Sequence, residues 1–288
     1  MTELRRRMIE DMQLHGLSGG TQNQYIRSVR IMAEHFRRSP DQLSDEQLRE
    51  FFLYLMREKG LAKPTLIIYR AAIKFLFEKT LQRPLPVFKL VRLERRRKLP
   101  VILSPKEVQH LLSLVRDPCI RMCLTMIYSC GLRLQEGTRL QISDIHSHRM
   151  LIHVRHGKGD KDRYVPLPRR SLELLRAYWL QGRPSPWLFP DQRETDRPLW
   201  RERPYKVLKA VLEPAKIKPV VNVHTLRHSY ATHLLEEGVS IRLISAYLGH
   251  ASIETTAIYT HLTAVNEAAA RAAVARLLPA VNHARPAA

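Results

Sequence analysis

The side chains that could do chemistry lie in four short motifs that are widely spaced along the chain. Together they supply two arginines, a lysine, two histidines and a tyrosine, a set that suits attack on a phosphodiester. A phenol with a pKa near 10 is only about 0.1% ionised at pH 7, so a tyrosine nucleophile needs nearby positive charge. Guanidinium groups can also hold the charge of a phosphorane-like transition state through bidentate hydrogen bonds. The motifs are Gly131-Leu132-Arg133, Gly157-Lys158-Gly159, His224-Thr225-Leu226-Arg227, and Gly249-His250 followed by Tyr259.

The His-x-x-Arg motif has the spacing of a phosphate site. His224 and Arg227 lie one helical turn apart at the start of a predicted helix, where backbone N–H groups also favour anions. The same spacing occurs at His35 and Arg38, where the surroundings predict a surface helix. A single match to this spacing therefore carries little information.

Each of the other motifs also has a purely structural interpretation. Glycines around Lys158 are typical of a β-turn, where a lysine is usually solvated. His250, directly after a glycine, would equally serve as a helix cap, and Arg133 as a surface residue beside Glu136. Tyr259 is one of ten tyrosines, and a tyrosine on a short helix packs by default in the core with its hydroxyl at the edge.

The order of the motifs is more informative than any one of them. It resembles the tyrosine recombinase, or phage integrase, family, whose pattern is arginine, lysine in a β-hairpin, His-x-x-Arg, histidine or tryptophan, and then tyrosine. The resemblance is strong over about 104 to 263, and the motifs are similar to those of chromosome-dimer-resolving recombinases and of integron integrases. The chain lacks the extra helical insertion that integron integrases carry before His-x-x-Arg. The matches are Arg133 in CGLRLQEG, Lys158 in GKGDKDRYVPL, His224 and Arg227 in HTLRHSYATHLLEEG, and His250 and Tyr259 in YLGHASIETTAIYTH.

This resemblance implies an enzyme that cuts and rejoins DNA through a covalent 3′-phosphotyrosine intermediate. Tyr259 would be the nucleophile, and Arg133 and Arg227 would clamp the scissile phosphate. The family assigns protonation of the leaving 5′-hydroxyl to the hairpin lysine, which here is Lys158.

The two histidines have less distinct roles under the same resemblance. His224 would help to accept or share the tyrosine proton, and His250 would hydrogen-bond the scissile phosphate or position Tyr259. The phosphotyrosine keeps the energy of the broken bond, so neither a nucleotide cofactor nor a metal is expected. GxxxxGK[ST], GxGxxG and HExxH motifs are also absent from the sequence.

The elements that must position these residues are mostly helical. Residues 1–88 show apolar side chains at helical spacing and a capping box at Ser44 and Gln47, which predicts a small all-helical domain. Residues 89–103 read as a basic interdomain linker. By resemblance the chain forms a two-domain, C-shaped DNA clamp, mainly α with a small β-hairpin or sheet.

The larger domain is expected over residues 104–288, with mixed α/β structure. Short β-branched runs, LIHVRH and RYVPL, bracket the turn-like GKGD and predict a hairpin with Lys158 at its tip. An alanine-rich tail helix is expected from about 264. The other predicted helices span about 170 to 182, 203 to 213, 224 to 237 and 240 to 248.

The charge balance favours a polyanionic partner. Lys and Arg number 48 against 27 Asp and Glu, a formal net charge of +21, which points to double-stranded DNA over the rival interpretation, a basic membrane-binding protein. No apolar run approaches the roughly 18 residues of a membrane span, and the first residues lack a signal-peptide core, so we expect a cytoplasmic protein. Candidate contacts to the DNA backbone are Arg95, Arg96, Arg97, Lys98, Lys161 and Arg163.

Assembly and competing functions follow from the same resemblance. The family packs a C-terminal segment into the next protomer of a ring, so a homotetramer on DNA with an exchanged tail helix is expected. A type IB topoisomerase would use nearly the same residues, and a DNA-binding regulator that has lost catalysis is the alternative from another class. The DNA target, and the choice among integration, excision, dimer resolution and transposition, are not encoded in these motifs.

Overall fold

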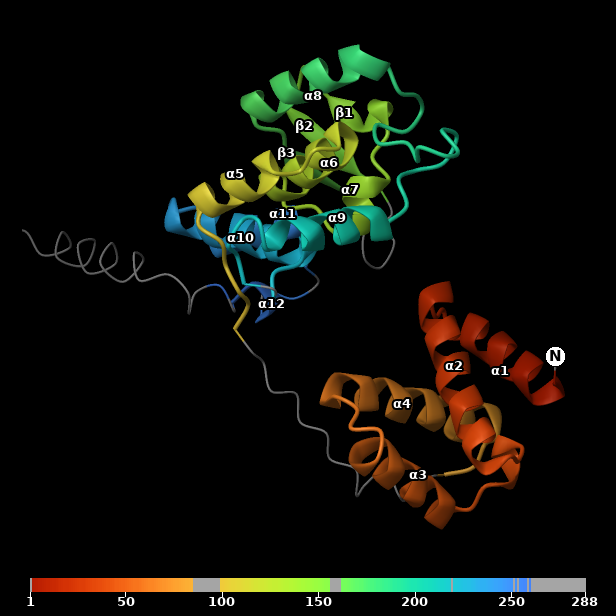
Figure 1. Ribbon diagram of the computed structural model, residues 1–288. Helices are drawn as coiled ribbons and strands as arrows, with labels where there is room; N and C mark the ends of the chain where they lie inside the picture. The colour runs from red at the N-terminus through yellow and green to blue at the C-terminus, as the bar shows by residue number, and fades with distance from the viewer. Residues whose placement is uncertain are drawn as a thin grey trace, which may run out of the picture. The chain divides into compact units, whose positions relative to one another are not determined.

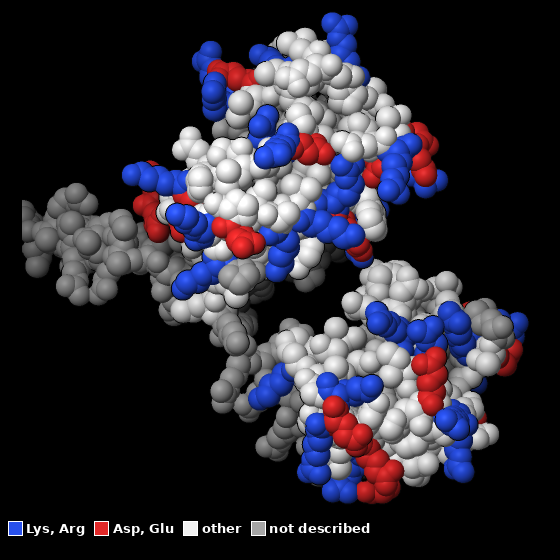
Figure 2. All heavy atoms as spheres, viewed as in Figure 1, with Lys and Arg blue, Asp and Glu red and all other residues white. Residues whose placement is uncertain are grey.

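The computed structural model has two compact units, formed by residues 1–98 and 99–288 (Figure 1). Lys and Arg side chains outnumber Asp and Glu on the visible face of both units (Figure 2). No helix among the described residues is long and apolar enough to cross a membrane. The structure describes residues 2–84, 99–155, 162–218, 220–250, 252, 254–257 and 259.

The first unit is helical, as predicted, and its helices meet in one apolar core. The predicted capping box is confirmed: the Gln47 backbone N–H donates to Ser44 Oγ, and the Ser44 N–H donates to Gln47 Oε1. Behind this cap the fully buried Phe51 and Phe52 pack in the core with Met32. The elements are α1 (Glu3–Leu14), α2 (Gly19–Phe36), a 3₁₀ turn (Pro40–Gln42), α3 (Asp45–Arg57), α4 (Lys63–Phe75) and a π turn (Leu76–Thr80).

The second unit combines helices with a three-stranded antiparallel sheet of order β1-β2-β3. The predicted hairpin is confirmed as β2 and β3, and a short strand that the sequence did not indicate, β1, adds to its edge. The elements are α5 (Pro105–Ser113), α6 (Pro118–Ser129), α7 (Leu134–Thr138), a 3₁₀ turn (Ile142–Asp144), β1 (Ile145–His146), β2 (Leu151–Val154), β3 (Arg163–Pro166), α8 (Arg169–Gly182), α9 (Glu202–Leu212), α10 (Val223–Glu236), α11 (Ile241–Leu248) and α12 (Glu254–Ala257).

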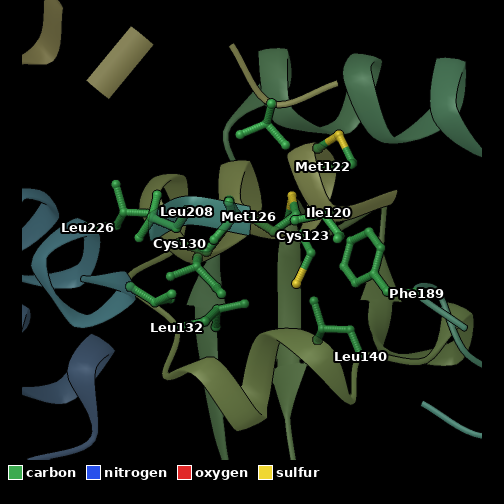
Figure 3. Packing of buried hydrophobic residues seen from close by; sticks show 14 of the residues in the cluster. Ile120, Met122, Cys123, Met126, Cys130, Leu132, Leu140, Phe189, Leu208 and Leu226 are labelled. Atoms are coloured by element: carbon green, nitrogen blue, oxygen red, sulfur yellow. The ribbon is translucent and has the colours of Figure 1, made fainter. Parts of the chain in front are cut away.

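Helix α6 runs through the middle of this unit and contacts α7, α8, α9 and α10 (Figure 1). Its side chains form an apolar core in which Met126 lies with Leu208 of α9 and Leu226 of α10 (Figure 3). The sheet adds its inner face, where the paired residues Ile152 and Val165 are fully buried. The core therefore fixes the end of α6 and the start of α10, the two places where matched arginines occur.

The segment expected to be a linker, 89–103, is described only from Leu99 onward. Its last residue, Leu103, is buried in the core of the second unit, and its backbone N–H donates to Ser229 Oγ at 3.0 Å. Leu103 is thus packed on α10, whereas Leu99 and Val101 are exposed. The backbone candidates Arg95, Arg96, Arg97 and Lys98 lie outside the described residues.

A glycine turn ends α6 and leads directly into Arg133. Gly131 has a φ of +62°, and a Cβ added there would lie 2.4 Å from Tyr230 Cε1. We expect Gly131→Ala to lose about 3 kcal/mol of unfolding free energy, because backbone strain and overpacking add. Gly238, with a φ of +80° and open space around it, is the matched control and should lose only about 1 kcal/mol as Gly238→Ala. Equal losses in urea titrations of the two variants would contradict the packing role.

Candidate active site

The matched residues that the structure describes converge where α6, α10 and α11 end or begin. Arg133 follows the glycine turn after α6, and its Nη2 donates to the Gly249 carbonyl at 3.0 Å. Arg227 lies on α10, and His250 follows α11. The motifs at residues 131–133, 224–227 and 249–250, far apart in sequence, thus meet in space. Lys158 and Lys161 lie outside the described residues.

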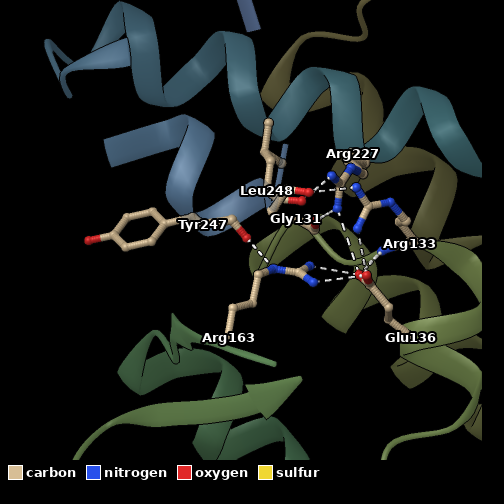
Figure 4. Close-up of polar contacts among 8 residues, drawn as sticks. Gly131, Arg133, Glu136, Arg163, Arg227, Tyr247 and Leu248 are labelled. Atoms are coloured by element: carbon tan, nitrogen blue, oxygen red, sulfur yellow. Dashed lines mark hydrogen bonds and ion pairs between the residues drawn. The ribbon is translucent and has the colours of Figure 1, made fainter. Parts of the chain in front are cut away.

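Glu136 is the anion around which the arginines gather (Figure 4). Arg133 donates to its carboxylate from Nη1 and from the backbone N–H, each at 2.7 Å. Arg163 donates through both Nη atoms, at 2.9 and 2.7 Å, and Arg227 Nη1 lies 3.7 Å away. Burial alone would raise the pKa of Glu136, but the bonds and charge of Arg163, with those of Arg133, lower it to about 2. Glu136 is therefore a permanent counter-ion at neutral pH.

Arg227 is the most deeply buried of the three arginines around Glu136, at 1% exposure. Its Nη1 donates to the Gly131 carbonyl at 2.6 Å and its Nη2 to the Leu248 carbonyl at 2.5 Å. Burial, followed by the charge of Arg133, lowers the pKa of Arg227 to about 9, so it remains a cation at neutral pH. The side chain ties α10 to the ends of α6 and α11 and holds a fixed positive charge there.

Arg163, a candidate contact to the DNA backbone, is largely enclosed by protein in this structure. Its side chain is only 10% exposed, and besides Glu136 it donates from Nε to the Tyr247 carbonyl at 2.8 Å. A Cβ on Gly249 would lie 2.9 Å from its Cδ. In this structure Arg163 links β3 to α11 and orients Glu136.

The two matched histidines are neutral near the arginines. His224 is in the first turn of α10, capped by Asn222, and burial, then Arg227 and Arg133, lower its pKa. Burial and the same arginines lower the pKa of His250 to about 4, and its Nδ1 hydrogen-bonds Thr256 Oγ1 at 2.8 Å. Both imidazoles can donate a hydrogen bond from one nitrogen and accept at the other.

Tyr259 is buried at 1% exposure and packs with Leu248 and other apolar residues of α10 and α11. Burial raises the pKa of its hydroxyl to about 12, and the charge of Arg227 opposes that rise. The hydroxyl hydrogen-bonds Nδ1 of His228 at 2.7 Å. Tyr259 thus keeps the packing expected of any buried tyrosine while its oxygen faces a basic nitrogen.

Two site residues were not singled out from the sequence as functional. Glu136 is three residues after Arg133, a spacing that signals an ion pair but not the centre of a network. His228 is one turn after His224 on α10, with their rings 4.8 Å apart, but no matched position falls on it. Among the described residues, no group of three or more His, Cys, Asp or Glu could hold a metal ion.

Glu136→Gln is expected to destabilise the protein at neutral pH but to have little effect on its stability near pH 2. The pKa of Glu136 is depressed on folding, so its stabilisation is complete above about pH 4.5 and is lost as the pH falls through about 2. A shift from 4.5 to about 2 corresponds to about 3 kcal/mol. Urea titrations across this range should show the gap between the wild type and Glu136→Gln closing as the pH falls. A gap that stays constant would contradict the ion-pair network.

Comparison with known proteins places this site in a family. Residues 102–265 match the phage integrase family, and residues 4–87 match the phage integrase N-terminal SAM-like domain. A Sinorhizobium fredii protein named as an integrase/recombinase, y4qK, is 42% identical over 280 residues, which cover 97% of this chain and 90% of that protein. The tyrosine recombinase XerD of Oceanobacillus iheyensis is 33% identical over 269 residues, covering 86% of this chain and 89% of XerD.

A solved DNA complex shows the same fold. The XerH site-specific recombinase, in a post-cleavage complex with palindromic difH substrate, is 25% identical with a TM-score of 0.67, covering 87% of this chain and 79% of that chain. The fold and the site define a tyrosine recombinase, and the chain belongs to the phage integrase family. Its activity is site-specific recombination by cleavage and rejoining of DNA strands.

Proposed function

We propose that Tyr259 is the nucleophile of this recombinase and that its oxygen attacks a phosphodiester to leave a 3′-phosphotyrosine and a free 5′-hydroxyl. The observation that carries the proposal is the position of the Tyr259 hydroxyl. It hydrogen-bonds His228 on α10 and lies close enough to Arg227 for that positive charge to lower its pKa. Of the ten tyrosines, Tyr259 also follows the other matched residues in the family order.

The remaining residues divide the work of the transition state. Arg133 and Arg227 bind the non-bridging oxygens, and neutral His250 donates a further hydrogen bond or orients the tyrosine segment. His224 lies beside the clamp as a second neutral donor or proton acceptor. Lys158 gives a proton to the departing 5′-oxygen, whose alkoxide is too basic to leave unaided.

Reversal of the same step completes recombination. The phosphotyrosine conserves the energy of the broken bond, so a 5′-hydroxyl from another strand attacks it and releases Tyr259. The proposal therefore requires neither ATP nor a metal ion. We place the reaction in the cytoplasm on double-stranded DNA, and the same chemistry serves integration, excision, dimer resolution or transposition.

A nicked suicide duplex tests the proposed chemistry. Cleavage near the nick releases a short fragment, so the covalent complex accumulates and survives denaturation. The target site is first obtained by selecting bound fragments from the DNA that flanks the coding sequence. A denaturation-resistant adduct is expected, and its absence on a bound site contradicts the proposal. Relaxation of any supercoiled plasmid without site preference would instead favour a type IB topoisomerase.

We also propose that the enzyme acts as a homotetramer in which the segment after about 264 packs on the next protomer. These residues lie outside the described part of the chain, and the proposal rests on their alanine-rich, helix-forming sequence. Deleting residues 265–288 should reduce strand exchange at least about tenfold and change the Kd for one DNA site by less than about twofold. Unchanged exchange by the truncated protein would refute a role in protomer coupling.

A further inference from the structure

We propose that His228, which is not among the matched positions, accepts the proton of Tyr259 when this tyrosine attacks DNA. The inference rests on the function proposed above, and it deepens it by naming the base. The resemblance assigned that role to His224. In the structure the Tyr259 hydroxyl hydrogen-bonds Nδ1 of His228 at 2.7 Å, a distance suited to direct proton transfer.

The protein fixes both partners of this contact. His228 lies on α10 directly after Arg227, whose two carbonyl contacts hold the helix against the ends of α6 and α11. The ring of Tyr259 packs among buried residues that include Leu248. The two rings lie 5.7 Å apart with planes tilted by 54°, so the hydroxyl meets the edge of the imidazole where Nδ1 is. Neither side chain needs a rotamer change for the transfer.

The charges around His228 keep it unprotonated before DNA binds. Burial, followed by His224 and Arg227, lowers the pKa of His228 to about 4. The titratable and charged groups that face it are His224 and Arg227 on α10, His250 after α11, and Tyr259 itself. In the tautomer with its hydrogen on Nε2, Nδ1 accepts the tyrosine O–H. A scissile phosphate beside this group brings negative charge that stabilises the imidazolium when it forms.

The proton transfer balances with the rest of the step. As Tyr259 Oη forms its bond to phosphorus, its proton moves to Nδ1 of His228 and the bond from phosphorus to O5′ breaks. O5′ takes a proton from Lys158. In rejoining, the incoming 5′-hydroxyl returns its proton to Lys158, and His228 returns its own to the released Tyr259. The resting state keeps the proton on tyrosine, because the pKa of Tyr259 is about 12 and that of His228 is about 4.

His228→Asn separates proton acceptance from positioning. An asparagine Oδ1 matches the place of Nδ1 and still accepts the tyrosine hydrogen bond, but it cannot hold a proton. Single-turnover cleavage of the nicked duplex should slow about 100-fold at pH 7, and the rate should rise about tenfold per pH unit as hydroxide replaces the lost base. A wild-type rate would overturn the proposal, and so would a slow rate with the pH profile of the wild type, which would mean positioning alone.

Three controls keep this result specific to His228. His233→Asn changes another α10 histidine whose Nδ1 contacts a tyrosine hydroxyl, that of Tyr128 at 2.9 Å, and should cleave at the wild-type rate. A substrate with sulfur in place of the bridging O5′ needs no leaving-group proton, so it should not rescue His228→Asn; rescue would overturn the proposal. If His228→Asn does not fold, His228→Phe is tested in its place, and its cleavage should be slowed at least about 100-fold at pH 7. Failure of the proposed function itself would appear separately, as no adduct from the wild type.

Discussion

Replacing Tyr259 with phenylalanine should abolish the covalent adduct, reducing cleavage by at least about 10⁴-fold, because the variant has no oxygen to form the bond to phosphorus. The ring that fills the apolar cluster remains, and the lost hydrogen bond to His228 costs only about 1 kcal/mol of stability. The variant should therefore fold and bind DNA. Adduct formation on the nicked duplex, measured beside the DNA-binding affinity, checks both parts.

Tyr230→Phe is the matched control for this result. Tyr230 is buried in the same apolar cluster as Tyr259 and lies on α10. Its loss of a hydroxyl should leave adduct formation within about threefold of the wild type, because its oxygen is assigned no part in the chemistry. An adduct that persists in Tyr259→Phe and disappears in Tyr230→Phe would identify Tyr230 as the nucleophile and contradict the proposal.

Arg227→Lys should reduce cleavage by about 10²- to 10³-fold even though it keeps the charge. A lysine ammonium cannot reproduce the planar fork with which Arg227 reaches the Gly131 and Leu248 carbonyls and, in the proposed mechanism, a phosphate oxygen. Loss of these buried contacts should also lower the unfolding free energy by about 2 to 4 kcal/mol. Single-turnover cleavage at saturating DNA, with urea titration of the same sample, separates the two effects.

Arg121→Lys is the conservative control for Arg227→Lys. Arg121 is exposed on α6 in the same unit, so its replacement should change stability by less than about 0.5 kcal/mol and leave cleavage unchanged. The catalytic role proposed for Arg227 would be wrong if Arg227→Lys cleaved as fast as Arg121→Lys. A loss of stability with normal cleavage would mean that Arg227 has a structural role only.

The secondary structure around the site could be predicted because local signals were strong. The hairpin runs, the Ser44 capping box and the four helices between about 170 and 248 are confirmed within one or two residues. Strand β1 was not predicted, because its two residues are too few to show the alternating apolar and polar pattern of a strand. The end of the expected linker proved to be packed, because burial of Leu103 depends on the surface of α10 and not on its neighbours in sequence.

The contacts within the site were harder to predict from the sequence than the positions of the matched residues. The matched arginines and histidines could be found because the family order is linear along the chain. The partners of those residues come from the fold: Arg163 reaches Glu136 from the sheet, and His228 on α10 meets Tyr259, which follows α12. The position of Arg163 near the hairpin suggested contact with DNA, but its ion pair with Glu136 could not be predicted from that position. Contacts between distant segments set such roles, and no local spacing encodes them.

The most direct test is to identify the atom that joins protein to DNA. The adduct formed on a nicked duplex with a 5′-labelled scissile strand is digested with protease and nuclease, and the modified peptide is sequenced by mass spectrometry. The predicted result is one nucleotide linked through its 3′-phosphate to Tyr259, with the label retained on the protein before nuclease treatment. A link to any other residue, or through a 5′-phosphate, would contradict the proposed mechanism.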